Sequence, residues 1–215
     1  MKKKFSVSVN KKIEKFNKKI EIPGDKSCSI RALLFASQCI GESKIFNLLE
    51  STDCLDCLKA LRVLGVKIVK RKKYYSVYGN GLNSFKIRKK LTRIYIGNSM
   101  TTGRLLAGLI STIPSKFYLY GDASANRRDF MRVIEPLEKV GARFLPRKAT
   151  LPLTMEGTSL PLAQKHIENR GSSQVKGLIL FSALSTPGIT TVEEIREKSS
   201  RTHTEIFLKK IGCDI

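Results

Sequence analysis

The strongest constraint on the fold of this chain is an internal repeat. Three segments share one pattern, an apolar helical stretch that ends at a glycine and leads into a strand-like stretch: residues 54–68, 130–144 and 202–215. Their closing glycines, Gly65, Gly141 and Gly212, are 76 and 71 residues apart. Glycine often follows a helix because it adopts the left-handed conformation without a Cβ clash. A period of this length predicts similar units that pack side by side.

A second set of apolar helical stretches alternates with the first, over residues 31–48, 104–121 and 175–194. Each is followed by a turn with Gly or Pro and by a strand-like stretch. The pattern predicts an α/β lobe of three repeated βαβαββ units, with the helices inside and the sheets outside. The third unit is truncated, because only three residues follow its closing glycine.

The predicted lobe covers residues 21–215, and residues 1–20 form a separate N-terminal segment. Phe5, Val7 and Val9 alternate with polar residues there, which predicts a strand. The segment has a basic start but no apolar stretch behind it, so it does not resemble a secretory signal. No apolar run in the chain approaches the roughly 18 residues that a membrane span needs. We expect a cytoplasmic protein without membrane contact.

The five cysteines do not predict a metal site. Cys54 and Cys57 form a CxxC pair, but no second pair and no histidine stand at ligand spacing, whereas a zinc site needs about four ligands. Both cysteines fall in a helical pattern, where residues three apart share a face. We expect reduced, structural thiols and no metal.

The formal net charge of +22 favours anionic partners, which include phosphorylated metabolites, nucleic acids and membrane surfaces. The basic clusters at residues 70–73 and 86–90 lack the regular aromatic interleaving of a base-stacking surface. Lysines dispersed over solvated faces explain the charge equally well. The net charge alone therefore does not distinguish between these kinds of partner.

The segments that precede the second set of helices point to anion binding. They read PGDKSCSIR (23–31), IGNSMTTGR (96–104) and NRGSSQVK (169–176), and each combines glycine, small hydroxyl or amide side chains and a cation. Backbone N–H groups at a helix N-terminus attract anions. Ser and Thr also cap helices for structural reasons alone. Three such segments at matching positions of a repeat nevertheless favour a ligand with several anionic groups.

Two further segments add arginines at helix starts. YGDASANRRDF (120–130) contains Arg127 and Arg128, of which we expect one in the site and one on the surface. Arg201 occupies the analogous place in KSSRTHTE (198–205). We interpret His203 as a structural residue of a helix start, and His166 has no partner in the pattern.

Together these motifs resemble those of the 5-enolpyruvylshikimate-3-phosphate synthase family (3-phosphoshikimate 1-carboxyvinyltransferases). The matching motifs, in the family's order, are PGDKS-x-S-x-R, GNS-x-T-x-x-R, GDAS followed by RR and VIEPLEKVGA, LPLTMEG, SSQVK and the SSRTHTE segment. The resemblance covers residues 5 to 215, about half of the family's usual length, and is strongest to the bacterial class with GDAS before the arginines. It implies transfer of the enolpyruvyl group of phosphoenolpyruvate to shikimate 3-phosphate, with release of phosphate, in chorismate and aromatic amino acid biosynthesis.

The resemblance also implies roles for individual residues. The residues implied to bind shikimate 3-phosphate are Lys26, Ser27, Arg31, Ser172, Ser173, Gln174 and Arg201. The residues implied to bind or shape the pocket for phosphoenolpyruvate are Lys26, Asn98, Met100, Thr101, Arg128 and Gln174. No metal or organic cofactor is implied, and no acid/base residue is expected in this half. The family's second lobe supplies that residue, and the N-terminal strand of this chain would belong to that lobe.

Three positions depart from the family's pattern. Met100 stands where glycine or alanine is usual, and its thioether is expected to narrow the phosphoenolpyruvate pocket. Gly103 stands where a larger residue is common. Asp129 replaces a usual proline and is expected to place a negative charge beside the anion site.

Other functions remain open at this point. The UDP-N-acetylglucosamine enolpyruvyl transferases share the fold, but their N-terminal Lys-Asn motif is replaced here by Lys26-Ser27. A basic nucleic-acid-binding protein is the alternative from another class, although we do not expect nucleic acid as a partner. A non-catalytic remnant is the third alternative.

Overall fold

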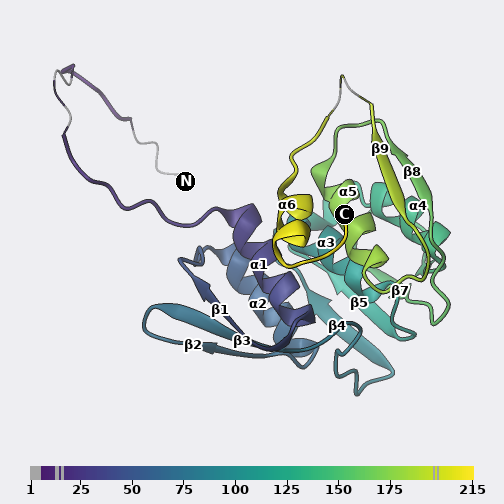
Figure 1. The fold of residues 1–215 in the computed structure, drawn as a ribbon. Helices are drawn as coiled ribbons and strands as arrows, with labels where there is room; N and C mark the ends of the chain where they lie inside the picture. Colours follow the sequence, from purple (N-terminus) through teal and green to yellow (C-terminus); the bar gives the residue numbers. More distant parts are fainter. Residues whose placement is uncertain (1–5, 13–14, 16, 196, 198) are drawn as a thin grey trace.

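The computed structural model describes residues 6–12, 15, 17–195, 197 and 199–215 of the chain. Helices and strands alternate along it (Figure 1). The helices are α1 (Lys26–Gln38), α2 (Thr52–Val63), α3 (Met100–Ile110), α4 (Met131–Val140), α5 (Ser173–Ala183) and α6 (His203–Lys210), with a short 3₁₀ turn at Ala125–Arg127. Among the described residues no helix is long and apolar enough to cross a membrane.

Three sheets accompany the helices. The first has the order β1-β3-β2 and consists of β1 (Ile40–Phe46), β3 (Tyr74–Asn80) and β2 (Lys67–Lys70), all antiparallel. The second has the order β4-β5-β7-β6 and consists of β4 (Leu91–Tyr95), β5 (Lys116–Tyr120), β7 (Leu153–Glu156) and β6 (Arg143–Leu145). In the third, β8 (Lys165–Glu168) pairs in parallel with β9 (Thr191–Glu194). The predicted α/β class is therefore confirmed.

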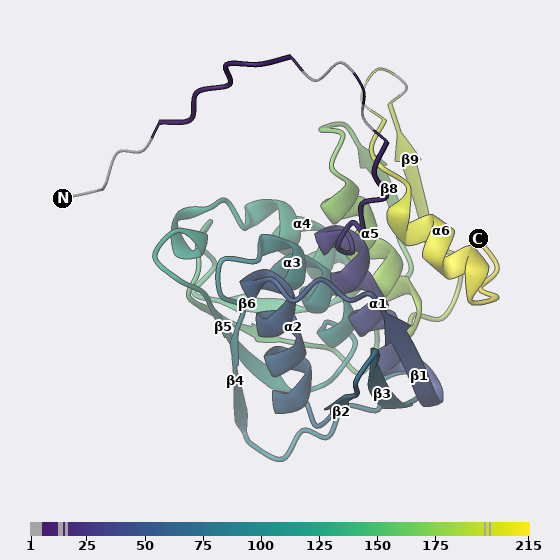
Figure 2. The same ribbon diagram turned by 90° about the vertical axis from the view of Figure 1, so that its left-hand side faces the viewer.

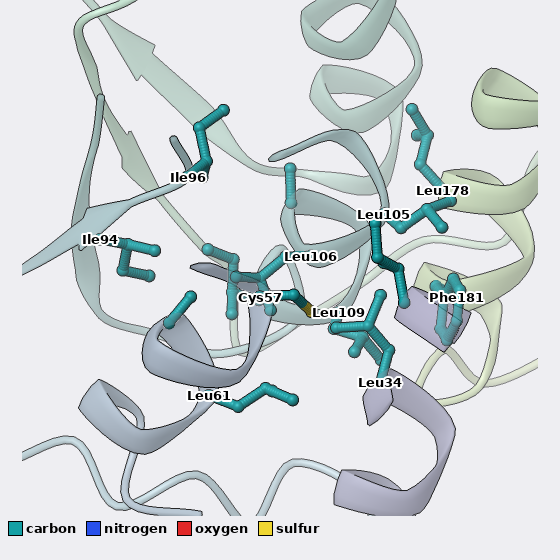
Figure 3. Packing of buried hydrophobic residues seen from close by; sticks show 14 of the residues in the cluster. Leu34, Cys57, Leu61, Ile94, Ile96, Leu105, Leu106, Leu109, Leu178 and Phe181 are labelled. Carbon is teal, nitrogen blue, oxygen red and sulfur yellow. The ribbon is translucent and has the colours of Figure 1, made fainter. Parts of the chain in front are cut away.

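Helix α3 lies at the centre, between α1 and α5, and the sheets lie toward the outside (Figures 1 and 2). Every residue of α3 except Arg104 is buried. Figure 3 shows Leu105 and Leu109 of α3 close to Leu34 of α1 and Phe181 of α5. Gly108 allows this packing, because a Cβ there would lie 2.2 Å from the Leu178 carbonyl oxygen of α5. The apolar helices predicted from the sequence therefore form the core.

The glycines that close the helices behave as predicted. Gly65, Gly141 and Gly212 follow α2, α4 and α6, with φ values of 86°, 113° and 86°. This left-handed conformation strongly favours glycine. The C-terminal ends of these three helices were therefore predictable from the sequence.

The strand predicted near the N-terminus stays a prediction, because it was expected to belong to the other lobe. Residues 6–12 and 17–25 contain no helix or strand, and Phe5 lies outside the described residues. Val7 and Val9 are 78% and 85% exposed. Strand β1 is correspondingly the edge of its sheet, whereas the equivalent strand β5 has a parallel neighbour in β4. Alternating apolar residues form a strand only when a neighbour accepts their backbone hydrogen bonds.

Candidate functional site

The N-terminal turns of α1, α3 and α5 meet at one polar cavity of about 270 Å³. Helix α6 and the segment before it close the cavity from a fourth direction. The lining residues are Ser27, Arg31, Thr101, Gly171, Ser173, Gln174, Ser199, Ser200, Arg201 and His203. The structure thus brings together six predicted site residues that are up to 174 positions apart in the sequence.

Each of the three helices is capped by a side chain. Asp25 Oδ1 accepts from the Cys28 N–H at 2.8 Å, and this hydrogen bond holds the pKa of Asp25 below its ordinary value. Ser99 Oγ accepts from the Thr102 N–H at 3.2 Å, and Ser172 Oγ accepts from the Val175 N–H at 3.3 Å. Ser172 does not line the cavity. Its side chain instead caps the N-terminus of α5.

Arg31 is the most deeply buried cation at the cavity, with 2% of its surface exposed. Its Nε donates to Thr204 Oγ1 at 2.8 Å, and its Nη1 donates to the Ser27 carbonyl oxygen at 3.1 Å. Burial lowers the pKa of Arg31, and no carboxylate of the described residues forms an ion pair with it. A buried cation with only neutral partners favours an anion in the adjoining cavity.

Gln174 connects α5 to α3 at the cavity wall. Its Nε2 donates to Thr101 Oγ1 at 3.0 Å, and its Oε1 accepts from Arg104 Nη1 at 2.5 Å. Arg104 also donates to the Asp129 carbonyl oxygen at 3.0 Å, but its buried Nε has no partner in the described part of the chain. Burial and the nearby Arg132 lower the pKa of Arg104. The sequence marked Arg104 only as a repeated cation and missed this contact.

The other predicted residues lie outside the cavity. Lys26 Nζ lies 3.1 Å from Asp53 Oδ2, on the exposed end of α1. Arg128 Nη2 donates to Asn98 Oδ1 at 2.7 Å and to Ser124 Oγ at 3.1 Å. Asn98 and Arg128 therefore form a separate pair near the start of α3.

The three departures from the family pattern are accommodated locally. Met100 is 5% exposed and belongs to the hydrophobic core, and it does not line the cavity. A Cβ on Gly103 would lie 2.5 Å from Ile96 Cδ1, so a larger residue does not fit there as the chain stands. Asp129 accepts from the Met131 N–H at 2.8 Å and pairs with Arg132 at 3.1 Å. Its charge is thus partly compensated by a neighbour on α4.

Lys176 has a partner arrangement that the repeat did not predict. Its Nζ lies 2.6 Å from Glu194 Oε2 and 2.6 Å from Glu205 Oε1, and its side chain is 5% exposed. Glu194 Oε1 also accepts from the Ser200 N–H at 2.9 Å. Lys176 is therefore not a free cation for a ligand. It joins α5, β9 and α6 and, through Glu194, fixes the segment that carries Ser200. Lys198, in the same segment, lies outside the described residues.

The cysteine pair and the histidines show no metal-binding geometry. Cys54 and Cys57 are fully buried in the core, and burial raises the pKa of Cys57 to about 12. His203 lines the cavity at the start of α6, and His166 Nε2 lies 3.5 Å from Glu168 Oε2. Across the part of the chain that the structure describes, no three His, Cys, Asp or Glu side chains form a metal-binding group.

The helix N-termini and the buried arginine of this α/β lobe converge on a small polar cavity, an arrangement that favours small anions. The chain belongs to the EPSP synthase (3-phosphoshikimate 1-carboxyvinyltransferase) family, whose model matches residues 10–215. It is 37% identical over 212 residues to the 3-phosphoshikimate 1-carboxyvinyltransferase of Nitrobacter winogradskyi. It is 41% identical over 207 residues to that of Oenococcus oeni.

The similarity extends to three-dimensional structure. An EPSP synthase of Acinetobacter baumannii superposes with a TM-score of 0.83 at 33% sequence identity, over 91% of this chain and 44% of that one. The two curated relatives are each covered to 46% of their length, and 95% of this chain matches them. The chain therefore spans about half the length of the relatives it matches.

Proposed function

We propose that this chain is the shikimate 3-phosphate-binding half of a 3-phosphoshikimate 1-carboxyvinyltransferase. The enzyme would transfer the enolpyruvyl group of phosphoenolpyruvate to shikimate 3-phosphate and release phosphate, on the path to chorismate and the aromatic amino acids. One observation carries the proposal. Six residues implied by the family motifs line a single cavity: Ser27, Arg31, Thr101, Ser173, Gln174 and Arg201.

The cavity suits a small ligand with a carboxylate and a phosphate. Arg31 would hold the carboxylate through its remaining guanidinium N–H groups, in a site where burial strengthens the contact. Ser173, with the first-turn N–H groups of α5, would receive the 3-phosphate beside Arg201. Gln174 stands between the helices and would contact both substrates.

Phosphoenolpyruvate would bind next to this cavity, toward Lys26, Asn98 and Arg128. The anion would take over contacts that these side chains now make with Asp53, Asn98 and Ser124. We assign no acid/base group to this half, and the proposed reaction needs no metal or organic cofactor from it. The second half of the enzyme would supply the proton-transferring group and close the cleft.

We further propose that the lobe consists of three βαβαββ units, of which the third is incomplete. The order β4-α3-β5-α4-β6-β7 forms one whole unit, and the strand orders β1-β3-β2 and β5-β7-β6 have the same antiparallel pairings. In this arrangement residues 1–20 would join the other lobe. We place the enzyme in the cytoplasm, where its metabolite substrates are made.

Titration calorimetry of the 215-residue chain with shikimate 3-phosphate tests the assignment. Replacing Arg31 by Ala should cost about 1.5–3 kcal/mol of binding free energy, the usual worth of a hydrogen bond to a charged group. Arg31→Lys should also weaken binding, because the ammonium group cannot form a bidentate contact. Arg147→Ala, which removes a surface arginine that pairs with Glu138, is the matched control and should change nothing.

Equal affinity of the wild type and both Arg31 variants would contradict the site. Tighter binding of UDP-N-acetylglucosamine than of shikimate 3-phosphate in the same calorimeter would assign the chain to the related enolpyruvyl transferase instead. Neither result would bear on the fold, because both concern only which substrate the cavity binds.

A further inference from the structure

A long part of the chain contains cations and no carboxylates. Residues 57–121 include fourteen Lys and Arg and not one Asp or Glu. This segment runs from α2 through the first turn after β5, and the structure describes all of it. Carboxylates from other segments pair with two of these cations, Lys59 with Asp56 and Lys70 with Glu50. The cations without such a partner are the ones that can attract an anion.

A large cavity lies in this region. It measures about 690 Å³ and lies between the end of α2, the loop after β3 and strand β4. We call it the basic groove, because five cations line it: Arg62, Lys86, Arg88, Lys89 and Arg93. None of the five forms an ion pair with a carboxylate of the described residues. It shares no lining residue with the cavity at the helix N-termini.

Tyrosines adjoin the basic groove on the outer face of the second sheet. The Arg93 guanidinium carbon lies 4.5 Å from the Tyr118 ring centre and 5.7 Å from that of Tyr120. The Tyr120 ring centre lies 5.2 Å from that of Tyr95 and 5.6 Å from that of Tyr118. Arg93 stands opposite Tyr118 and Tyr95 opposite Tyr120 in the parallel register of β4 and β5. We call these three rings the tyrosine ladder.

The position of the tyrosine ladder explains why the sequence did not predict it. Alternate residues of β4 and β5, such as Ile94, Phe117 and Leu119, point into the core and are fully buried or nearly so. The tyrosines therefore point outward, and Tyr95 is 41% exposed. Cations and aromatic rings interleave across two strands that are 25 residues apart in register, and not along the chain. A search along the sequence for interleaved aromatic residues misses such an arrangement.

We propose that the basic groove and the tyrosine ladder form a binding site for single-stranded nucleic acid. The five cations hold phosphates along the groove, and Arg93 connects the groove to the rings. Bases stack on the tyrosines, as they do on aromatic side chains of open sheets in other single-strand binders. A polyanion without rings, such as polyphosphate, would use the groove alone. One exposed ring, Tyr95, and two half-buried rings, Tyr118 and Tyr120, lie beside cations that have no carboxylate partner. This combination favours a ligand that has both charge and flat bases.

Fluorescence anisotropy with two labelled oligonucleotides tests this inference. Each is about 12 units long, a length within the range that one single-strand-binding domain covers. One probe is oligo-dT, and the other is an abasic strand with the same phosphates and no bases. The wild-type chain should bind oligo-dT at least several-fold more tightly than the abasic strand. Both affinities should fall steeply with salt, because each phosphate contact releases counterions.

Two double variants separate the contributions. Tyr95→Thr/Tyr120→Thr should abolish the preference for oligo-dT and leave binding of the abasic strand unchanged. A β-branched residue suits both positions, because they lie opposite each other in strands β4 and β5. Arg88→Ala/Lys89→Ala should weaken both probes and reduce the slope of log affinity against log salt by about 1.4, or about 0.7 per contact for a single strand.

The matched control is Lys209→Ala/Lys210→Ala, which removes two exposed cations from α6, on the opposite side of the molecule from β4 (Figure 2). This control should bind both probes like the wild type. Equal affinity of the wild type for both probes, an unchanged preference in the tyrosine variant, or an equal loss in the control would each overturn the proposal. So would tighter binding of anionic lipid vesicles than of oligo-dT at the same salt concentration.

Discussion

At the scale of single residues, positions 100 and 103 show how the chain accommodates two departures from the family motif. Met100 is buried in the core, and Gly103 faces the Cδ1 atom of Ile96. Positions three apart on a helix share a face, so a large residue at one and none at the other keep α3 against its neighbours. The sequence identified both departures. It could not show that Ile96 is the reason for Gly103, because Ile96 belongs to the loop before the helix.

Gly103→Ala should destabilise the chain. The added methyl group forces Ile96 to move, and overpacking of this kind typically costs about 1–3 kcal/mol. The better helix propensity of alanine offsets at most about 1 kcal/mol of that cost. Urea denaturation of the wild type, Gly103→Ala, Ile96→Val and the double variant measures the effect.

Ile96→Val is the informative partner in this cycle because it removes the Cδ1 atom that the new methyl group would meet. The double variant should therefore be more stable than the sum of the single effects allows. Simple additivity of the two changes would show that another contact sets the requirement for glycine.

At the residue scale, several residues expected at the site lie together. Ser27, Arg31, Ser173 and Gln174 do share one cavity, because helix N-termini at equivalent points of a repeat are brought together when the helices pack. The partners of these residues were not predictable. Thr204 is 173 positions from Arg31, and only the packing of α6 against α1 brings its hydroxyl group to the guanidinium.

At the scale of elements, Lys176 and its two carboxylates hold the third sheet and α6 to the core. Helix α5 supplies the cation, β9 supplies Glu194, and α6 supplies Glu205. Burial opposes the charged forms, but the hydrogen bonds outweigh it, so the pKa of Lys176 is raised and that of Glu194 is lowered. The repeat predicted a cation here but not its pairing, since the acidic partners have no counterparts in the other units.

Lys176→Met should lower the free energy of unfolding by about 3 kcal/mol, the lower end of the cost of leaving a buried charge unpaired. It should also change the response to acid. A carboxyl group whose pKa is lowered by folding stabilises the fold fully above its ordinary value of 4.5 and loses that effect as pH falls through the lowered pKa.

Thermal unfolding between pH 7 and pH 3 checks this second effect. The wild type should lose stability over the acid part of this range, and Lys176→Met should lose less, because Glu194 no longer depends on its charge for a partner. A matched loss of a surface pair, Lys165→Met, which removes the contact with Glu193, should leave the acid response as it is. Parallel curves for the wild type and Lys176→Met would contradict the assignment.

The helices and their ends could be predicted from periodicity and glycine because both signals are local. A strand depends on a neighbour, and the neighbour expected for the N-terminal strand lies in the other lobe. Val7 and Val9 have the right alternation, but no described strand accepts their backbone groups. Pairing in the third sheet is likewise set by distant residues, from β8 to β9.

At the scale of the whole molecule, the chain carries one side of the proposed active site. It matches relatives over about half of their length, and the cavity at the helix N-termini opens to the surface through exposed residues such as Arg201. Positive charge suits both the proposed substrate cavity and the proposed nucleic-acid surface, which lie at different places. Composition predicted an anionic partner but could not separate the two.

The 215-residue chain by itself should bind shikimate 3-phosphate but should not release phosphate from phosphoenolpyruvate at a measurable rate. Assistance to proton transfer is typically worth about 10²–10⁴-fold, and an open half-site leaves the anions in water. Adding the separately expressed C-terminal half of a related enzyme should restore some phosphate release. A matched mixture with the Arg31→Ala chain should remain slower. Substantial turnover by the chain alone would show that the proton-transferring group lies within it.

The close approach of α3 and α5 at Gly108 has a consequence for hydrogen exchange. Amides of these two central helices should exchange only when the whole lobe opens, because their side chains form the core. The N-terminal turns of the same helices line the cavity proposed to bind shikimate 3-phosphate. A ligand should therefore slow exchange throughout α3 and α5 by the full free energy of binding, while the solvent-facing loops respond little. The exchange rate of a deeply buried amide such as that of Leu106 then reports how much of the cavity at the helix N-termini is occupied by ligand.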